Sequence, residues 1–267
     1  MEKHGHPVAR HLAMAGALAA LLALPGCKVA PAPAPGPEAA PKPALMSWRV
    51  AAAYLDDIFE TIPNSSIDDF RKDTPEEERA LVNASHGDAG IKEGNAYVYG
   101  EPTPVTTDLM LRSMKVTDQD VIYDLGCGRG YFLMQALLTT PARKAVGAEL
   151  AASRINIGKS AARKMAEQGL LPKGKVLELH EEDLVKTNVD DATIVFMDSV
   201  FFSDELLTSV AKRMARAKNM RTVAMIMKGL PPNPWFELDR KERLKMSWSP
   251  RFGSDVLYYK RTAVPAD

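Results

Sequence analysis

The stretch Val121-Ile-Tyr-Asp-Leu-Gly-Cys-Gly-Arg-Gly-Tyr131 decides the predicted fold. Its first residues are mostly apolar and predict a buried strand that stops at Asp124, and the three glycines that follow predict a sharp turn. A second apolar strand, 144–149, also ends on a carboxylate, Glu149. Two strands that end on acids, with a glycine turn between them, indicate a site for a nucleoside whose ribose hydroxyls need an acceptor.

Strand and helix signals alternate along the chain from about residue 105. The candidate strands are 120–125, 144–149, 175–180, 192–198 and 221–228. The helical segments between them are 106–115, 130–139, 151–168 and 203–217. This alternation predicts an α/β fold of the Rossmann-like kind, with a mostly parallel seven-stranded sheet. The last two strands, 243–249 and 255–262, are expected to form an antiparallel edge hairpin.

The glycine spacing separates two kinds of nucleotide site. Gly126, Gly128 and Gly130 let the backbone approach a ligand closely, and the helix that follows presents free N–H groups to a carboxylate. The dinucleotide pattern Gly-x-Gly-x-x-Gly fails because Tyr131 stands at its last position. Asp124 would repel a diphosphate but attract the ammonium group of methionine. The stretch therefore favours S-adenosylmethionine as the cofactor.

Three acids follow three successive predicted strands. Glu149 can accept hydrogen bonds from both ribose hydroxyls, and Asp183 can accept one from an adenine amino group. Leu184 stands beside Asp183 and can pack on the adenine ring. Because ligands of open α/β sheets bind beyond the carboxyl ends of the strands, Asp124, Glu149 and Asp183 are expected to share one site.

Two flanking motifs carry a resemblance to a known family. Val98-Tyr-Gly-Glu-Pro-Thr-Pro104 precedes the first core helix, and Ser247-Trp248 and Tyr258-Tyr259 lie near the end. Over about residues 95–262 the chain resembles class I methyltransferases. The motifs are similar to those of the disruptor-of-telomeric-silencing histone-lysine methyltransferases, which lack a SET domain. The Pro-Thr-Pro part resembles bacterial relatives, and also mitochondrial lysine methyltransferases that modify an ATP synthase subunit.

The resemblance implies a cofactor role for a first group of residues. Val98, Tyr99 and Thr103 would cover the methionine end of the cofactor. The remaining cofactor contacts would come from Asp124, Gly126, Gly128, Gly130, Glu149, Asp183 and Leu184.

The resemblance also implies a place for the acceptor. Asp198 occupies the position of the family's asparagine motif, beside the transferable methyl group. A carboxylate holds a charged amine as well as a neutral one, so the substrate and the acceptor atom stay open. A lysine side chain would enter an aromatic channel, for which the candidates are Phe201, Phe202, Trp248, Tyr258 and Tyr259.

The first 27 residues predict an export signal. Residues 12–24 are apolar but too few to span a bilayer, and they match the apolar region of a signal peptide. Leu24-Pro-Gly-Cys27 resembles the lipobox of bacterial lipoproteins, which implies a lipid anchor on Cys27, membrane contact and a place in the cell envelope. Translation from Met46 would instead give a cytoplasmic protein.

The remainder of the chain divides by composition. Residues 28–45 are rich in proline and alanine and predict a semi-rigid linker. Residues 46–95 predict a small helical segment, including a helix that Thr74 caps. The methyltransferase domain is expected over 96–267.

Charge and metal-ligand spacing limit the partners. Basic and acidic residues both number 34, so no overall field favours nucleic acid. Basic runs at 212–218 and 239–245 could bind a nucleosome or another acidic partner, but the neutral total charge favours solvated helix faces. The histidines form no cluster with metal-ligand spacing, and no metal site is predicted.

Three functions follow from these observations. The first is a methyltransferase that acts on a protein lysine. The second is a methyltransferase for a small molecule or another atom, which Asp198 suggests. The third is a non-catalytic envelope lipoprotein that retains the fold as a binding module. Cofactor binding separates the third from the other two.

Overall fold

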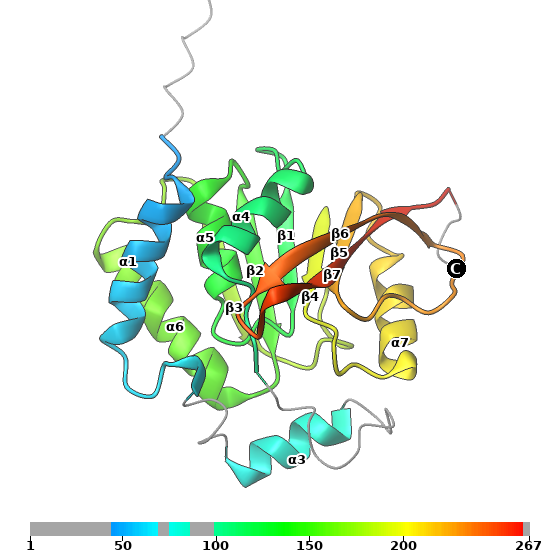
Figure 1. Cartoon of the computed structure of the whole chain (residues 1–267), viewed down its shortest axis with the longest axis horizontal. Helices are drawn as coiled ribbons and strands as arrows, with labels where there is room; N and C mark the ends of the chain where they lie inside the picture. The colour runs from blue at the N-terminus through cyan, green and yellow to red at the C-terminus, as the bar shows by residue number, and fades with distance from the viewer. Residues whose placement is uncertain (1–43, 69–74, 86–98, 264–267) are drawn as a thin grey trace, which may run out of the picture. The chain divides into compact units, whose positions relative to one another are not determined.

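The computed structural model describes residues 44–68, 75–85 and 99–263 (Figure 1). The predicted signal segment, Cys27 and nearly all of the linker lie outside the described residues, as do Thr74 and Val98. The chain divides into residues 1–41 and 42–267, and the second unit holds every element described below. Among the described residues, no helix has the length and apolar character that a bilayer crossing requires.

A seven-stranded sheet runs through the second unit. In chain order its strands are β1 (Val121–Leu125), β2 (Lys144–Glu149), β3 (Val176–Glu181), β4 (Ile194–Met197), β5 (Thr222–Ile226), β6 (Phe236–Met246) and β7 (Ser249–Arg261). Their order across the sheet is β3-β2-β1-β4-β5-β7-β6. The first five pair in parallel, whereas β7 is antiparallel to both β5 and β6. The predicted Rossmann-like sheet with an antiparallel edge is therefore confirmed.

Helices cover both faces of this sheet. They are α1 (Trp48–Glu60), α3 (Glu76–Ser85), α4 (Pro104–Ser113), α5 (Tyr131–Thr139), α6 (Ala152–Glu167) and α7 (Asp204–Met214). Side chains alternate along β1, so Tyr123 packs on the side of α7 and Ile122 on the side of α4 and α5. Helix α1 forms an outer layer, where Leu55 and Ile58 pack with residues of α5 and α6.

The edge hairpin differs from its prediction. β6 begins at Phe236 rather than at residue 243, and β7 begins at Ser249 rather than at 255. The basic run 239–245 is therefore part of an edge strand and not a helix face. Between buried Phe236 and buried Met246 the strand carries mostly charged side chains, which suit an edge because they discourage pairing with other chains.

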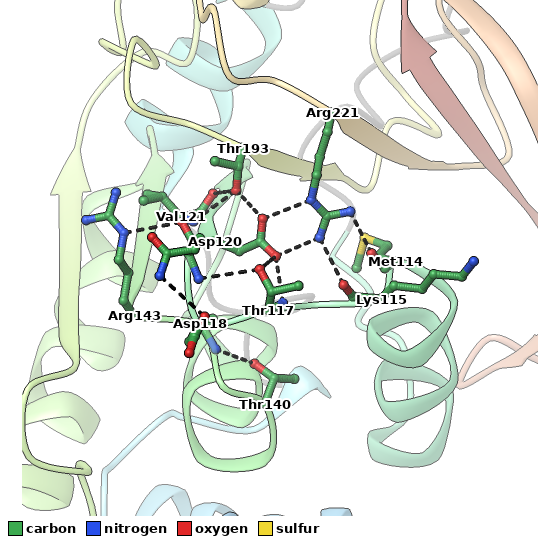
Figure 2. A network of polar contacts seen from close by, with 12 residues as sticks. Met114, Lys115, Thr117, Asp118, Asp120, Val121, Thr140, Arg143, Thr193 and Arg221 are labelled. Atoms are coloured by element: carbon green, nitrogen blue, oxygen red, sulfur yellow. Dashed lines mark hydrogen bonds and ion pairs between the residues drawn. The ribbon is translucent and has the colours of Figure 1, made fainter. Parts of the chain in front are cut away.

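Asp120 joins the amino ends of β1, β4 and β5 through hydrogen bonds from residues that directly precede these strands (Figure 2). The Arg221 guanidinium donates to both carboxylate oxygens, at 2.9 and 2.6 Å. The Thr193 hydroxyl donates at 2.7 Å, and the Thr117 N–H also donates at 2.7 Å. Burial alone would raise the pKa of Asp120, but these hydrogen bonds lower it to about 2. The carboxylate is therefore ionised when the fold is intact.

Asp120→Asn should lower the free energy of unfolding by about 2–3 kcal/mol, because its hydrogen bonds from a charged guanidinium are weakened. The folded pKa lies below the unfolded value, so this stabilisation is full above about pH 4 and disappears as the pH falls through about 2. Urea unfolding at pH 7 and near pH 2 measures the effect. Exposed Asp118→Asn is the control, with a change under about 0.5 kcal/mol. If wild type and Asp120→Asn still differ in free energy of unfolding near pH 2, the substitution has disturbed packing instead.

Candidate active site

A cavity of about 340 Å³ opens at the carboxyl ends of the parallel strands. Gly126, Glu149, Asp183 and Asp198 line it from the ends of β1, β2, β3 and β4. The volume lies in the range of small-molecule pockets, and the position is where open α/β sheets bind ligands. A second, small cavity of about 20 Å³ is lined by Asp124, and it shares Asp198 and Gly126 with the first.

The structure brings most of the predicted site residues to these two cavities. The larger one is lined by Tyr99, Gly126, Glu149, Asp183, Leu184, Asp198, Phe201, Phe202 and Trp248. Asp124 lies on the smaller one, which also contacts Asp198. Glu149 and Asp183 thus share the larger cavity, whereas Asp124 lines the smaller one, which adjoins it at Gly126 and Asp198.

Other predicted residues lie elsewhere. Thr103 is the N-cap of α4, where its hydroxyl oxygen accepts from the Thr106 N–H at 3.3 Å. Tyr259 packs on the side of α7, and its hydroxyl accepts from the Leu230 N–H at 3.1 Å. Tyr258 is fully buried on the other face, and its hydroxyl donates to Glu242 at 3.3 Å. None of the three lines either cavity, whereas Phe201, Phe202 and Trp248 line the larger one.

Glu149 connects the glycine turn to the end of β2. One carboxylate oxygen accepts from the Gly128 N–H at 2.9 Å, and the other accepts from the Ala151 N–H at 2.8 Å. The side chain is buried but still contacts the cavity. Because a carboxylate has about four acceptor positions, it can also receive two hydroxyl groups of a ribose.

The glycine turn is shaped by close contact with Tyr99. Gly128 has a φ of +53°, and a Cβ there would lie 2.2 Å from Cε2 of the Tyr99 ring. Gly130 has a φ of +76° and is the N-cap of α5. Neither glycine lines the cavity. They contribute by letting the backbone N–H groups and Tyr99 approach the ligand site.

A buried ion pair holds the segment before α4 against the glycine turn. Arg129 donates from Nε and Nη2 to the two oxygens of Glu101, at 2.8 and 2.9 Å. It also donates to the Ser65 carbonyl at 2.9 Å and stacks 4.2 Å from the centre of the Phe59 ring. The Tyr99 hydroxyl donates to Glu101 as well. This network fixes Tyr99, which forms one wall of the cavity.

The two flanking motifs of the sequence meet at this place. The Ser247 hydroxyl donates to the Glu101 carbonyl at 2.9 Å. A Cβ at Gly100 would lie 2.9 Å from Cε3 of the Trp248 ring, so only glycine permits this contact. Sequence reasoning missed the network because each partner comes from a separate segment. Arg154, also missed, lines the cavity with its guanidinium 5.0 Å from the centre of the Tyr99 ring.

Asp124 of β1 and Asp198, directly after the neighbouring strand β4, place two carboxyls at the centre of the site. Burial raises the pKa of Asp198 to about 7, against a weaker opposing effect of the Val200 N–H. Burial, and then the charges of Asp198 and Glu149, raise the pKa of Asp124. Asp198 Oδ1 has no hydrogen-bond partner among the described residues. Such a buried acceptor is costly unless a ligand satisfies it, so the site suits a ligand with N–H groups.

Comparisons with known proteins agree with this geometry. Residues 80–233 match the family model described as "Histone methylation protein DOT1". A protein-lysine N-methyltransferase of Saccharolobus islandicus is 29% identical over 107 residues, which are 40% of this chain and 63% of that protein. The matched region thus spans less than two thirds of that relative.

Two solved structures are also similar. An RNA methyltransferase from Salinibacter ruber with S-adenosyl-L-homocysteine is 22% identical, covering 63% of this chain and 98% of that one, with a TM-score of 0.47. Magnesium protoporphyrin IX methyltransferase from Synechocystis PCC 6803 with bound S-adenosylmethionine is 14% identical, covering 69% and 97%, with a TM-score of 0.46.

The family match covers more than half of the 267 residues and contains the strand-end acids described above. The buried acceptors and the cavity fit S-adenosylmethionine, which is the cofactor of this family, so the cofactor prediction is confirmed. The chain belongs to the DOT1 histone-methylation family of class I, S-adenosylmethionine-dependent methyltransferases.

Proposed function

We propose that this protein transfers a methyl group from S-adenosylmethionine to the side-chain nitrogen of a protein lysine. The observation that carries the proposal is that acidic and aromatic side chains line the same cavity. Glu149 and Asp183 line it together with Phe202, Trp248 and Asp198, whose Oδ1 has no partner among the residues that the structure describes. The DOT1 family match and the lysine methyltransferase from Saccharolobus islandicus support a lysine acceptor.

The first group of residues would hold the cofactor. Glu149 would accept from the ribose hydroxyls, Asp183 from the adenine amino group, and Asp124 from the methionine ammonium. Leu184 would pack on the adenine ring. When bound, the cofactor supplies a methyl group on a sulfonium, and transfer forms a nitrogen–carbon bond while the carbon–sulfur bond breaks and leaves its electron pair on sulfur. Because this is an in-line displacement, positioning supplies most of the rate.

The second group would hold the acceptor. Phe201, Phe202 and Trp248 give the cavity an aromatic wall that can enclose the four-carbon stem of lysine. Aromatic faces attract the cationic form, while burial among apolar groups lowers the pKa of a lysine from about 10.4. The wall therefore both binds the side chain and helps it lose a proton.

A small molecule or a different atom is the second candidate acceptor. Asp198 favours it, because the family's lysine enzymes are expected to have an asparagine there. A non-catalytic lipoprotein with an anchor on Cys27 is the third, and it requires neither cofactor binding nor transfer. Mass spectrometry of the mature N-terminus tests the anchor: a lipidated Cys27 supports an envelope location, and an N-terminus at Met46 removes it.

Cofactor binding and label transfer separate these functions. We expect calorimetry on the full chain to show S-adenosylmethionine binding, and no binding at high micromolar cofactor would contradict both enzyme functions. The protein is then incubated with methyl-labelled cofactor and a cell lysate, and labelled proteins are hydrolysed to amino acids. Label in methyl-lysine supports the first candidate. Label confined to small molecules or to other residues supports the second.

A further inference from the structure

We propose that the Asp198 carboxylate binds the acceptor's ammonium group and takes one proton from it before methyl transfer. The preferred acceptors are then primary amines that are protonated at neutral pH. This inference rests on the proposed methyltransferase function and names the chemical class of its substrate.

The position of Asp198 carries the first step of the argument. Asp198 directly follows β4, whose residues Ile194–Met197 are all buried. Its side chain lines both the large cavity and the small one. Oδ1 has no partner among the described residues, and the one backbone donor to the carboxyl is the Val200 N–H. A ligand with several N–H bonds supplies the missing donor.

The neighbouring charged groups single out this carboxyl. The titratable groups that line the two cavities are Tyr99, Glu101, Asp124, Cys127, Tyr131, Glu149, Arg154, Glu182 and Asp183. Glu101 is paired with Arg129, and Glu149 receives two backbone N–H groups. Asp124 is the expected partner of the methionine ammonium. Asp183 receives the Val185 N–H at 3.0 Å. Among these carboxyls, Asp198 has the buried oxygen that lacks a partner in the described part of the chain, so we assign the second cation to it.

The proton step balances without another reactant. An N–H bond of the ammonium breaks and an O–H bond forms on Asp198, so that an ion pair becomes a neutral amine and a neutral acid. Burial favours the neutral pair, and a carboxyl with a pKa near 7 is a far better proton acceptor than one near 4. The amine then has a free electron pair. Asp198 returns the proton to water before the next turnover.

An asparagine at this position would behave differently. Its amide oxygen can accept a hydrogen bond from an amine, but it carries no charge and takes up no proton. Asp198→Asn thus preserves shape while it removes both proposed activities of the carboxylate. Because the buried acid is itself unfavourable, this variant should fold with an unchanged or higher melting temperature.

The test compares two cofactor analogues, so it does not need the natural acceptor. S-adenosylhomocysteine lacks the methyl group, and sinefungin carries a C–NH₃⁺ group where the cofactor carries its sulfonium methyl. We expect Asp198→Asn to weaken sinefungin binding at least tenfold, because a charge-assisted hydrogen bond is lost. The affinity for S-adenosylhomocysteine should stay within about threefold of the wild-type value. Glu182→Gln is the matched control, since it removes another carboxylate of the same cavity and should not change the ratio.

Calorimetry at pH 7 in buffers of different ionisation enthalpy provides a second measurement. Wild-type protein should release more protons when it binds sinefungin than when it binds S-adenosylhomocysteine, because a part-protonated Asp198 ionises beside the additional ammonium, and Asp198→Asn should lose this excess. If Asp198→Asn weakens the binding of both analogues to the same extent, so that the ratio of their affinities is unchanged, the proposal is overturned. If wild-type protein binds neither analogue, the proposed function fails as well. Asp198→Ala gives the same comparison if the asparagine variant does not fold.

Discussion

Glu101→Ala should lower the free energy of unfolding by about 3–5 kcal/mol, because it leaves the Arg129 guanidinium buried without its carboxylate. The two side chains are only 13% and 10% exposed. Burial opposes the charge on Arg129, but the Glu101 carboxylate raises the pKa of the guanidinium, which therefore stays charged. An arginine cannot relieve this cost by losing a proton.

The loss of stability should also affect the segments that contact Glu101 and Arg129. Arg129 contacts Phe59 and Ser65 in the segment that includes α1, and Glu101 receives the hydroxyl of Tyr99. For a chain of this length, 3–5 kcal/mol corresponds to a fall in melting temperature of roughly 10 °C. Cofactor affinity should fall too, since Tyr99 is a wall of the cavity.

Thermal and urea unfolding measure this prediction against a matched pair. Asp108→Ala breaks an ion pair with Arg112, whose side chain is 74% exposed, and should cost under about 0.5 kcal/mol. The double variant Glu101→Ala with Arg129→Met should recover part of the stability, because it removes the buried charge. A loss for Glu101→Ala no greater than for Asp108→Ala would show that the buried pair does not stabilise the fold.

The fold was predictable where the signal is local. The strands β1, β2, β4 and β5 are short, mostly apolar runs, whereas β3 alternates apolar and polar residues. Asp124, Glu149 and Asp183 stand at or just after strand ends, so the sheet order brings them to neighbouring cavities. The edge strand β6 was misplaced because its charged side chains hide the period-two pattern. The acids could be located from the strand ends alone. The limits of β6 depend on its pairing with β7, which the sequence pattern does not contain.

The position of Tyr258 and Tyr259 away from both cavities has a related cause. Neighbouring residues of a strand point to opposite faces, so the pairing of β7 with β5 decides where Tyr258 and Tyr259 lie. That pairing sends one to each side of the sheet and neither to the cavity. The Glu101–Arg129 pair was missed for another reason. Its partners are 28 residues apart, and neither segment indicates the other.

Glu149→Ala should weaken S-adenosylmethionine binding by about 1–3 kcal/mol, which is roughly 5- to 150-fold in the dissociation constant. The substitution removes an acceptor for the ribose hydroxyls. It also leaves the N–H groups of Gly128 and Ala151 without the carboxylate that now receives them. The expected loss of affinity thus combines the lost ribose contact with the disturbance of the glycine turn. Calorimetry at one pH measures the sum of the two.

A cofactor analogue separates the two parts. Glu181→Ala is the control, because Glu181 lies opposite Glu149 in the pairing of β2 with β3 but is exposed, and it should change the affinity less than twofold. An S-adenosylhomocysteine that lacks the ribose 2′-hydroxyl should lose less affinity on Glu149→Ala than the complete molecule does. An equal loss would assign Glu149 to the turn alone, and an unchanged dissociation constant would remove it from the site. Because the carboxylate contacts both the turn and the cavity, we expect the complete ligand to show the larger penalty.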